Sequence, residues 1–164
     1  MSANPVRIFV PIDAAALSVG AEAVAQAIAS EAAARGLSVE IVRNGSRGML
    51  WLEPLVEIET AEGRIAYGPV AAKDVASLFD AGLVSGGAHG LRLGRTEELD
   101  WMKRQQRLTF ERVGVIDPLS IAEYRAHGGF KGLEKALGLT GGEIVEAVKA
   151  SGLRGRGGAG FPTG

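Results

Sequence analysis

The chain has 164 residues, of which 46% are hydrophobic and 23% are charged, as is ordinary for a globular protein. Its formal net charge of -1 provides no overall positive field for nucleic acid or anionic lipid, and no run approaches the length of a membrane span. Because it has no cysteine, its own thiolates cannot form a disulfide or hold zinc or an iron–sulfur cluster. With no secretory signal pattern either, we expect a cytoplasmic protein.

The first predicted elements form a strand–helix–strand unit. Residues 6–12 (VRIFVPI) are apolar and rich in β-branched side chains, which predicts a buried strand. Residues 14–34 are rich in alanine, with larger apolar side chains at helical spacing, and Gly36 is a plausible helix stop. Residues 37–44 alternate as a second strand.

A hairpin and a second helix follow this unit. Residues 55–60 and 64–70 are strand-like runs around a short glycine-containing turn, and residues 72–83 predict a helix that ends at Gly82. The order strand–helix–strand–strand–strand–helix predicts an α/β (α+β) domain with a mixed sheet, because neighbouring hairpin strands must be antiparallel.

The stretch SGGAHG at residues 85–90 predicts a boundary, which divides the chain into residues 1–88 and 89–164. Beyond it the pattern is helical. Residues 97–106 predict a charged, exposed helix, and Asp117 followed by proline predicts a helix start.

Two more helices lead to the C-terminal segment. Residues 130–137 are helical in pattern after a glycine-containing stop, and residues 140–143 (TGGE) form a capping box that opens the next helix. Three short helices therefore precede residues 151–164, SGLRGRGGAGFPTG.

This last stretch has glycine at positions 152, 155, 157, 158, 160 and 164. Glycines let backbone N–H groups approach an anion or a flat ring, and arginine supplies a fork suited to phosphate. The stretch is neither a P-loop nor a dinucleotide-binding fingerprint, since no Gly-Lys-Ser/Thr follows and no strand precedes it. From the residues alone, the alternative is a flexible glycine-rich tail.

The stretch 151–164 resembles the flavin-binding signature of the NADH-binding flavoprotein subunits of respiratory complex I, NAD-reducing hydrogenases and NAD-dependent molybdenum formate dehydrogenases. IDPLSIAEYRAHGGFKGLEKAL resembles the family's helical lead-in, so the resemblance covers about residues 99–164. It implies FMN and NAD as cofactors and a second, truncated domain. The family's completing lysine and a [4Fe–4S] cluster would lie beyond Gly164.

Carried over by position, the resemblance implies that Gly155, Arg156, Gly157 and Gly158 lie against the flavin, with Gly160 in the same cofactor-binding set. Phe161 matches an aromatic residue that stacks on the nicotinamide nucleotide, whereas Arg154 has a structural alternative.

The first half resembles the thioredoxin-like ferredoxin domain that accompanies these flavoproteins. The positions of its cluster cysteines are occupied by Pro11, Ala16, Ser46 and Leu50, so we expect the fold without the cluster. A cysteine-free domain fused in front of the flavoprotein most resembles the β subunit of soluble NAD-dependent formate dehydrogenase.

The resemblance implies a subunit that passes electrons between iron–sulfur clusters and NAD+/NADH through FMN, with no catalytic side chain in this segment. Its implied partners are a molybdenum-containing catalytic subunit and a small [2Fe–2S] subunit. The alternatives are a cluster-free docking module, or the diaphorase subunit of a hydrogenase or of complex I.

Several other side chains suit plainer roles. Trp51 and Trp101 suit either a core or an interface, and Asp13, Glu53 and Glu57 show no pairing that indicates acid–base chemistry.

Overall fold

The computed structural model describes residues 4–164. They form two compact units, one ending at Tyr124 and one running from Arg125 to Gly164, and each is described by itself.

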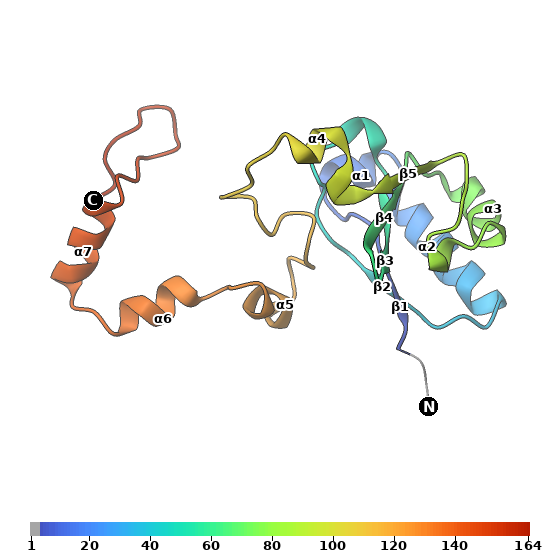
Figure 1. Cartoon of the computed structure of the whole chain (residues 1–164), viewed down its shortest axis with the longest axis horizontal. Coiled ribbons are helices and arrows are strands. Elements are labelled where there is room, and N and C mark those ends of the chain that lie inside the picture. Colours follow the sequence, from blue (N-terminus) through green and yellow to red (C-terminus); the bar gives the residue numbers. More distant parts are fainter. Residues whose placement is uncertain (1–3) are drawn as a thin grey trace. The chain divides into compact units, whose positions relative to one another are not determined.

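The first unit is built on a five-stranded mixed sheet in the order β2-β1-β3-β4-β5 (Figure 1). The strands are β1 (Val6–Phe9), β2 (Val39–Val42), β3 (Val56–Thr60), β4 (Gly63–Tyr67) and β5 (Arg92–Arg95). β1 and β2 are parallel, whereas β3, β4 and β5 join by antiparallel pairing. A strand–helix–strand unit with an antiparallel hairpin added beside β1 is the thioredoxin-like arrangement. The predicted fold class is therefore confirmed.

The helices of this unit are α1 (Ala14–Ser18), α2 (Ala21–Ala34), α3 (Val75–Asp80) and α4 (Asp100–Lys103). The prediction of one helix over residues 14–34 was wrong, because Gly20, at φ 101°, breaks it between α1 and α2. Glycine adopts this left-handed geometry without the steric cost of a Cβ atom. Asp13 caps α1, its carboxylate accepting the N–H groups of Ala15 and Ala16.

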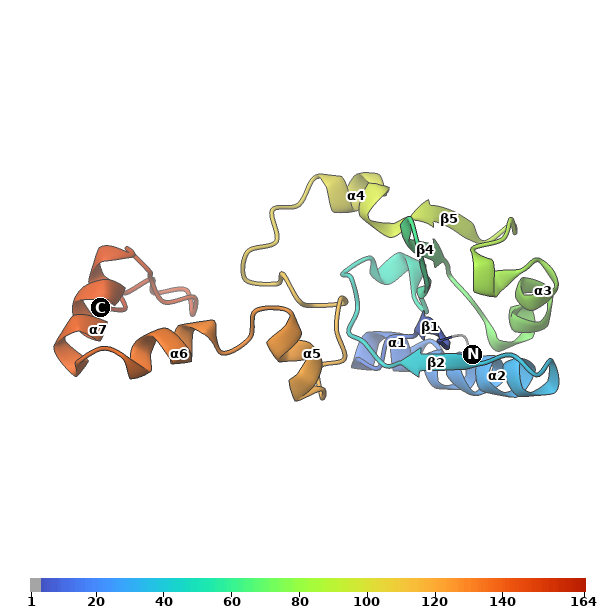
Figure 2. The ribbon, with the colours of Figure 1, turned by 60° about the horizontal axis from the view of Figure 1, so that its bottom comes forward.

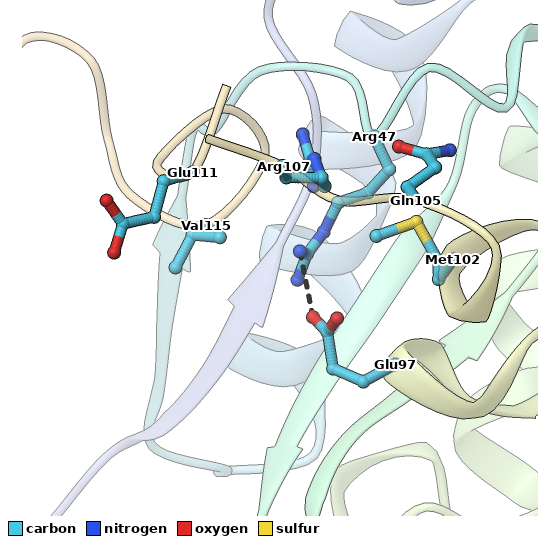
Figure 3. A pocket seen from close by; sticks show the side chains of 7 residues that line it. All are labelled: Arg47, Glu97, Met102, Gln105, Arg107, Glu111 and Val115. Atoms are coloured by element: carbon cyan, nitrogen blue, oxygen red, sulfur yellow. Dashed lines mark hydrogen bonds and ion pairs between the residues drawn. The ribbon is translucent and has the colours of Figure 1, made fainter. Parts of the chain in front are cut away.

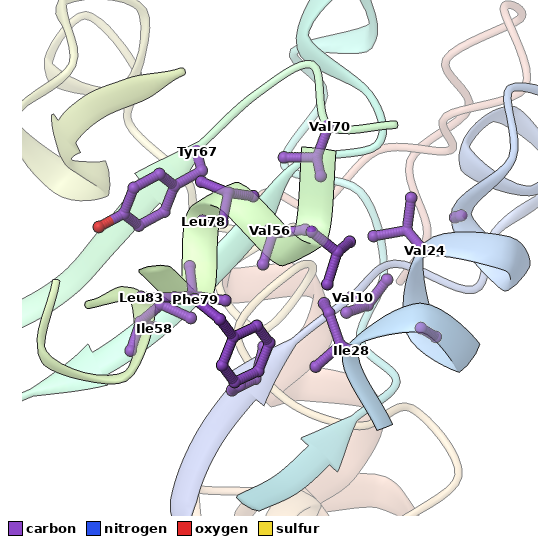
Figure 4. Packing of buried hydrophobic residues seen from close by; sticks show 14 of the residues in the cluster. Val10, Val24, Ile28, Val56, Ile58, Tyr67, Val70, Leu78, Phe79 and Leu83 are labelled. Carbon is purple, nitrogen blue, oxygen red and sulfur yellow. The ribbon is translucent and has the colours of Figure 1, made fainter. Parts of the chain in front are cut away.

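The main hydrophobic core lies between one face of the sheet and the helices α2 and α3 (Figure 4). Because side chains alternate along a strand, Ile65 and Tyr67 of β4 enter this core while Ala66 faces the other side. On that second face, Ala66 packs with Met49, Leu55 and Met102. The fold thus covers both faces of β4.

Strand β5 was not predicted. It pairs with β4 and comes after the expected boundary at residue 88, so the sheet continues past that point. Its sequence RLGR has charged ends and Gly94 at φ 107°, which removes the alternating pattern of a strand. The division into residues 1–88 and 89–164 as separate domains stays a prediction.

The helix predicted over residues 97–106 was too long. Residues 96–98 form a 3-10 turn, α4 covers only Asp100–Lys103, and a coil leads from there to α5 (Ile121–Ala126) (Figure 2). The helix expected to start at Asp117 starts at Ile121 instead, because the Asp117 carboxylate accepts the N–H of Leu119 in a local turn.

The second unit contains α6 (Lys131–Leu137) and α7 (Gly141–Ala150), as the sequence predicts. No side chain between Arg125 and Gly164 is buried. Across residues 4–164, no helix combines the length and apolar character that crossing a bilayer requires.

Candidate functional site

The glycine-rich stretch begins at the end of α7. The predicted capping box opens this helix: Thr140 Oγ1 accepts the N–H of Glu143, and the Glu143 carboxylate accepts the N–H of Thr140. After the helix ends, Gly152 takes φ 66° and turns the chain away from the helix axis. The helix therefore provides a defined start for the loop.

The base of the loop is closed by hydrogen bonds. Arg154 and Pro162 form an isolated antiparallel bridge, flanked by Gly155 N–H to Phe161 O at 2.8 Å and Thr163 N–H to Leu153 O at 2.9 Å. The Arg154 side chain also donates from Nε to Gly160 O at 2.7 Å. These bonds favour a formed loop over a flexible tail, and they give Arg154 the structural role left open for it.

The tip of the loop presents unused donors. Within residues 4–164, the backbone N–H groups of 156–160 have no hydrogen-bond partner, and neither does the exposed Arg156 guanidinium. Gly158 and Gly160 adopt φ values of 92° and 63°. Successive free N–H groups beside a guanidinium form the kind of concavity that binds an anion such as phosphate.

Space beside the tip is also open. A Cβ atom added at Gly157 or Gly158 would meet no protein atom within 4 Å, so a ligand could lie directly against this backbone. Phe161 is held by its backbone at the loop base, and its ring is 77% exposed. The residues present thus fit a flavin phosphate and a flat ring, although the individual cofactor assignments stay predictions.

The four positions aligned with cluster cysteines lie in the first unit. Pro11 and Ala16 are buried, Ser46 accepts the N–H of Gly48, and Leu50 is exposed. None carries a thiol. Among residues 4–164 there is no group of three or more His, Cys, Asp or Glu side chains arranged to hold a metal ion.

Buried carboxylates lie nearby, which sequence reasoning did not bring together. Burial raises the pKa of Glu53, and the negative charges of Asp13 and Glu57 add to the rise. Glu53 Oε2 accepts the N–H of Leu55 at 2.9 Å, whereas its buried Oε1 has no partner within the described residues. An uncompensated buried oxygen of this kind favours the protonated acid.

A second buried polar group centres on Glu57. Its carboxylate accepts two hydrogen bonds from Arg47, Nε to Oε2 at 3.2 Å and Nη2 to Oε1 at 3.0 Å, and the two side chains are only 1% and 3% exposed. Arg64 lies 3.7 Å away, with its guanidinium stacked on the Phe9 ring. The bidentate pairing marks this cluster as structural.

Arg47 also borders a cavity of about 310 Å³ (Figure 3). Its lining residues are Arg47, Glu97, Met102, Gln105, Arg107, Glu111 and Val115. Arg47 Nη1 donates to Glu97 at 2.9 Å, and burial lowers the pKa of Arg107, whose side chain donates to Val113 O. Opposite charges balance along the wall, so the cavity shows no preference for an anion or a cation.

No family model matches the chain. A segment of 62 residues is 56% identical to NADP-reducing hydrogenase subunit HndC of Solidesulfovibrio fructosivorans, covering 38% of this chain and 13% of that protein. One F subunit (number 2) of the NADH-quinone oxidoreductase of Rhizobium meliloti is 60% identical over 53 residues, or 32% of this chain and 13% of that protein. The F subunit of the Escherichia coli NADH-quinone oxidoreductase is 43% identical over 75 residues, or 45% of this chain and 15% of that protein.

The chain therefore spans only about 13% to 15% of the length of these relatives. Among solved structures, a thioredoxin-like [2Fe–2S] ferredoxin from Aquifex aeolicus superposes with a TM-score of 0.48 at 18% identity. That match covers 57% of this chain and 94% of the ferredoxin.

Proposed function

Since a segment of this chain is homologous to F subunits of NADH-quinone oxidoreductases and to a subunit of an NADP-reducing hydrogenase, we propose that it works in an NAD-linked oxidoreductase complex. In this proposal, residues 151–164 contribute to an FMN site. The single observation that carries it is the loop tip, where free N–H groups lie beside an unpaired Arg156.

Each loop residue has a defined task in this proposal. Gly157 and Gly158 let the flavin approach the backbone, and Arg156 binds its phosphate or ring edge through charge-assisted hydrogen bonds. Gly155 and Gly160 hold the loop closed at its base, through Phe161 O and Arg154 respectively. The exposed Phe161 ring offers a stacking surface for the nicotinamide of NAD.

When bound, FMN exchanges a hydride with the nicotinamide cofactor and single electrons with iron–sulfur clusters. This segment needs no acid or base for that exchange, because its contribution is binding and orientation. A [4Fe–4S] cluster would be held by cysteines outside these 164 residues, since the chain has none.

We further propose formate as the electron donor of the complex, with a molybdenum-containing catalytic subunit and a small [2Fe–2S] subunit as partners. The support is the fusion of a thioredoxin-like domain, cysteine-free in this chain, to the flavoprotein segment. Donation from hydrogen, or a place in complex I, fits the relatives equally well. Formate-dependent and hydrogen-dependent reduction of NAD+, measured on a complex purified through a tag on this chain together with its molybdenum content, separates these donors.

The flavin site is tested by Gly157→Val in the flavoprotein that contains this chain. A branched side chain would occupy the space of the ligand, so flavin absorbance after gel filtration should be lost. Gly132→Val is the matched control, because that glycine also has open space around its Cβ position but lies outside the loop. If Gly157→Val keeps stoichiometric flavin, the loop does not contact the cofactor, and the docking-module alternative gains support.

Arg156→Ala supplies a graded test of the same site. Loss of a charge-assisted hydrogen bond should weaken flavin binding by about 1.5–3 kcal/mol. Lys135→Ala, which removes an exposed cation outside the loop, should leave binding unchanged. Equal flavin affinity in the Arg156 variant and the parent protein would remove Arg156 from the site.

A further inference from the structure

The chain contains two tryptophans, and the structure brings them together on one exposed surface. Trp51 and Trp101 meet edge to face, with ring centroids 5.1 Å apart, although they are 50 positions apart in the sequence. They are 59% and 47% exposed, and Leu50 beside them is 58% exposed. Exposed aromatic rings that gather on one surface of a folded domain are typical of a binding surface.

The neighbours of these tryptophans anchor them to the domain. Met49 and Met102, which flank Leu50 and Trp101 in the chain, are buried together in the small core on the second face of the sheet. Because both segments are fixed from below, the two rings are presented in a set geometry. A preorganised aromatic pair loses little conformational freedom when a partner covers it.

The surface around the pair is cationic. Between Trp101 and Phe110 the sequence has no acidic residue, and it includes Lys103 and Arg104, both exposed. Neither cation forms an ion pair within residues 4–164. We call Leu50, Trp51, Trp101, Lys103 and Arg104 the tryptophan surface.

The acidic residues just before this segment do not neutralise it. Glu97 is bound to Arg47 at 2.9 Å, and Glu98 is bound to Arg95 at 2.8 Å. Asp100 is exposed at the start of α4 and offsets one positive charge, so the balance over residues 100–104 remains positive. A partner that complements this surface must offer carboxylates around an apolar depression.

We propose that the tryptophan surface docks an acidic face of another protein subunit in the same complex. The indole rings fill an apolar depression on that subunit, and carboxylates at its rim pair with Lys103 and Arg104. A symmetric contact with a second copy of this chain is disfavoured, because it would bring these cations close to their own equivalents. This inference rests on the proposed function for one point, membership of a multisubunit complex.

The direct test uses the assembled complex, purified through a tag on this chain and treated with a carbodiimide, which joins lysine amines to carboxylates in contact with them. Mass spectrometry should find the Lys103 peptide joined to an aspartate or glutamate of another subunit. A Lys103 peptide joined only within this chain, or to its own copy, would overturn the proposal.

Two variants test the energetics. Trp51→Ala with Trp101→Ala should weaken binding to that subunit by about 30-fold, the effect of losing one central interface contact of about 2 kcal/mol. Lys103→Glu with Arg104→Glu should also weaken it without touching the core, so this pair remains informative if the tryptophan variant fails to fold. Val19→Ala and Lys73→Glu, exposed apolar and cationic positions elsewhere on the unit, should have no effect.

The outcomes separate this proposal from the function it rests on. If the parent chain assembles and both variants assemble equally well, only the tryptophan surface is refuted. If the parent chain assembles with no other subunit, the proposed function and the docking proposal both fail. If the surface instead binds vesicles of phosphatidylcholine with phosphatidylserine, and the variants lose that binding while keeping their subunits, the partner is a membrane and the proposal is overturned.

Discussion

The two units of this chain are held together in different ways. The unit ending at Tyr124 encloses a continuous core between its sheet and the helices α2 and α3, together with a smaller cluster on the opposite face. From Arg125 onward no side chain is buried, and large apolar side chains such as Leu133 and Leu137 are exposed. Burial stabilises the first unit, whereas helix caps and loop hydrogen bonds order the second.

The difference indicates where each unit's structure comes from. A sheet domain with a filled core can hold its functional surfaces rigidly by itself. The segment with the flavin-type loop, in contrast, retains apolar surface that only another surface or a ligand can cover, so its order should respond to binding. The predictions below test this contrast, beginning with the largest effect.

The largest loss of stability is expected at the buried pair of Glu57 and Arg47. Glu57→Gln would leave the guanidinium groups of Arg47 and Arg64 without their carboxylate, which should lower the free energy of unfolding by about 3–5 kcal/mol in urea titrations. Glu59→Gln is the matched control on the same strand face, because Glu59 is exposed and its ion pair with Arg7 is long, at 3.8 Å. Its effect should stay below about 1 kcal/mol. Equal losses in the two variants would refute a structural role for the buried pair.

Truncation of an apolar side chain should separate the two units. Ile28→Ala in the core of α2 should cost about 2–5 kcal/mol of unfolding free energy, since it leaves a cavity. Leu137→Ala, at a side chain that is largely exposed, should change it by less than about 0.5 kcal/mol. A comparable loss at Leu137 would show that the second unit has a core contributing to global stability.

A smaller, local effect is expected at the cap of α7. Thr140→Ala removes the hydroxyl that accepts the N–H of Glu143 and should cost about 1 kcal/mol. Faster amide hydrogen exchange should appear within α7 and the following loop, while exchange from β1 and β3 stays unchanged. Faster exchange in the sheet as well would mean that the two units unfold together.

The smallest effect concerns the buried acid Glu53. Because burial raises its pKa in the folded state, the folded protein binds more protons than the unfolded chain as pH rises above about 4.3, so its contribution to stability falls until the raised pKa is passed. Relative to the parent, Glu53→Gln should therefore become progressively more stable as pH rises through this window. Glu62→Gln, at an exposed position, should show no such trend in unfolding titrations at a series of pH values. A parallel pH dependence in parent and Glu53 variant would contradict the expectation.

The local features of this protein follow from the sequence alone. The capping box at Thr140 and Glu143 and the hairpin of β3 and β4 were predicted, because their signals lie within a few residues of each other. The glycine-rich loop was also identified, and its residues are ordered by hydrogen bonds between near neighbours, such as Gly155 to Phe161. Even here, the break at Gly20 was missed, since a single glycine within an alanine-rich helix is a weak signal.

Other features depend on contacts between distant parts of the chain. Strand β5 exists because β4 offers it an edge, although its own residues carry no strand pattern. Asn44 and Arg64 are both bonded to the Gly114 carbonyl, and Trp51 meets Trp101, across separations that no local period reveals. Short-range hydrogen bonds and periodicity are thus determined by the sequence, whereas the buried polar cluster and the tryptophan surface were decided by tertiary packing, which alone brings those side chains within reach.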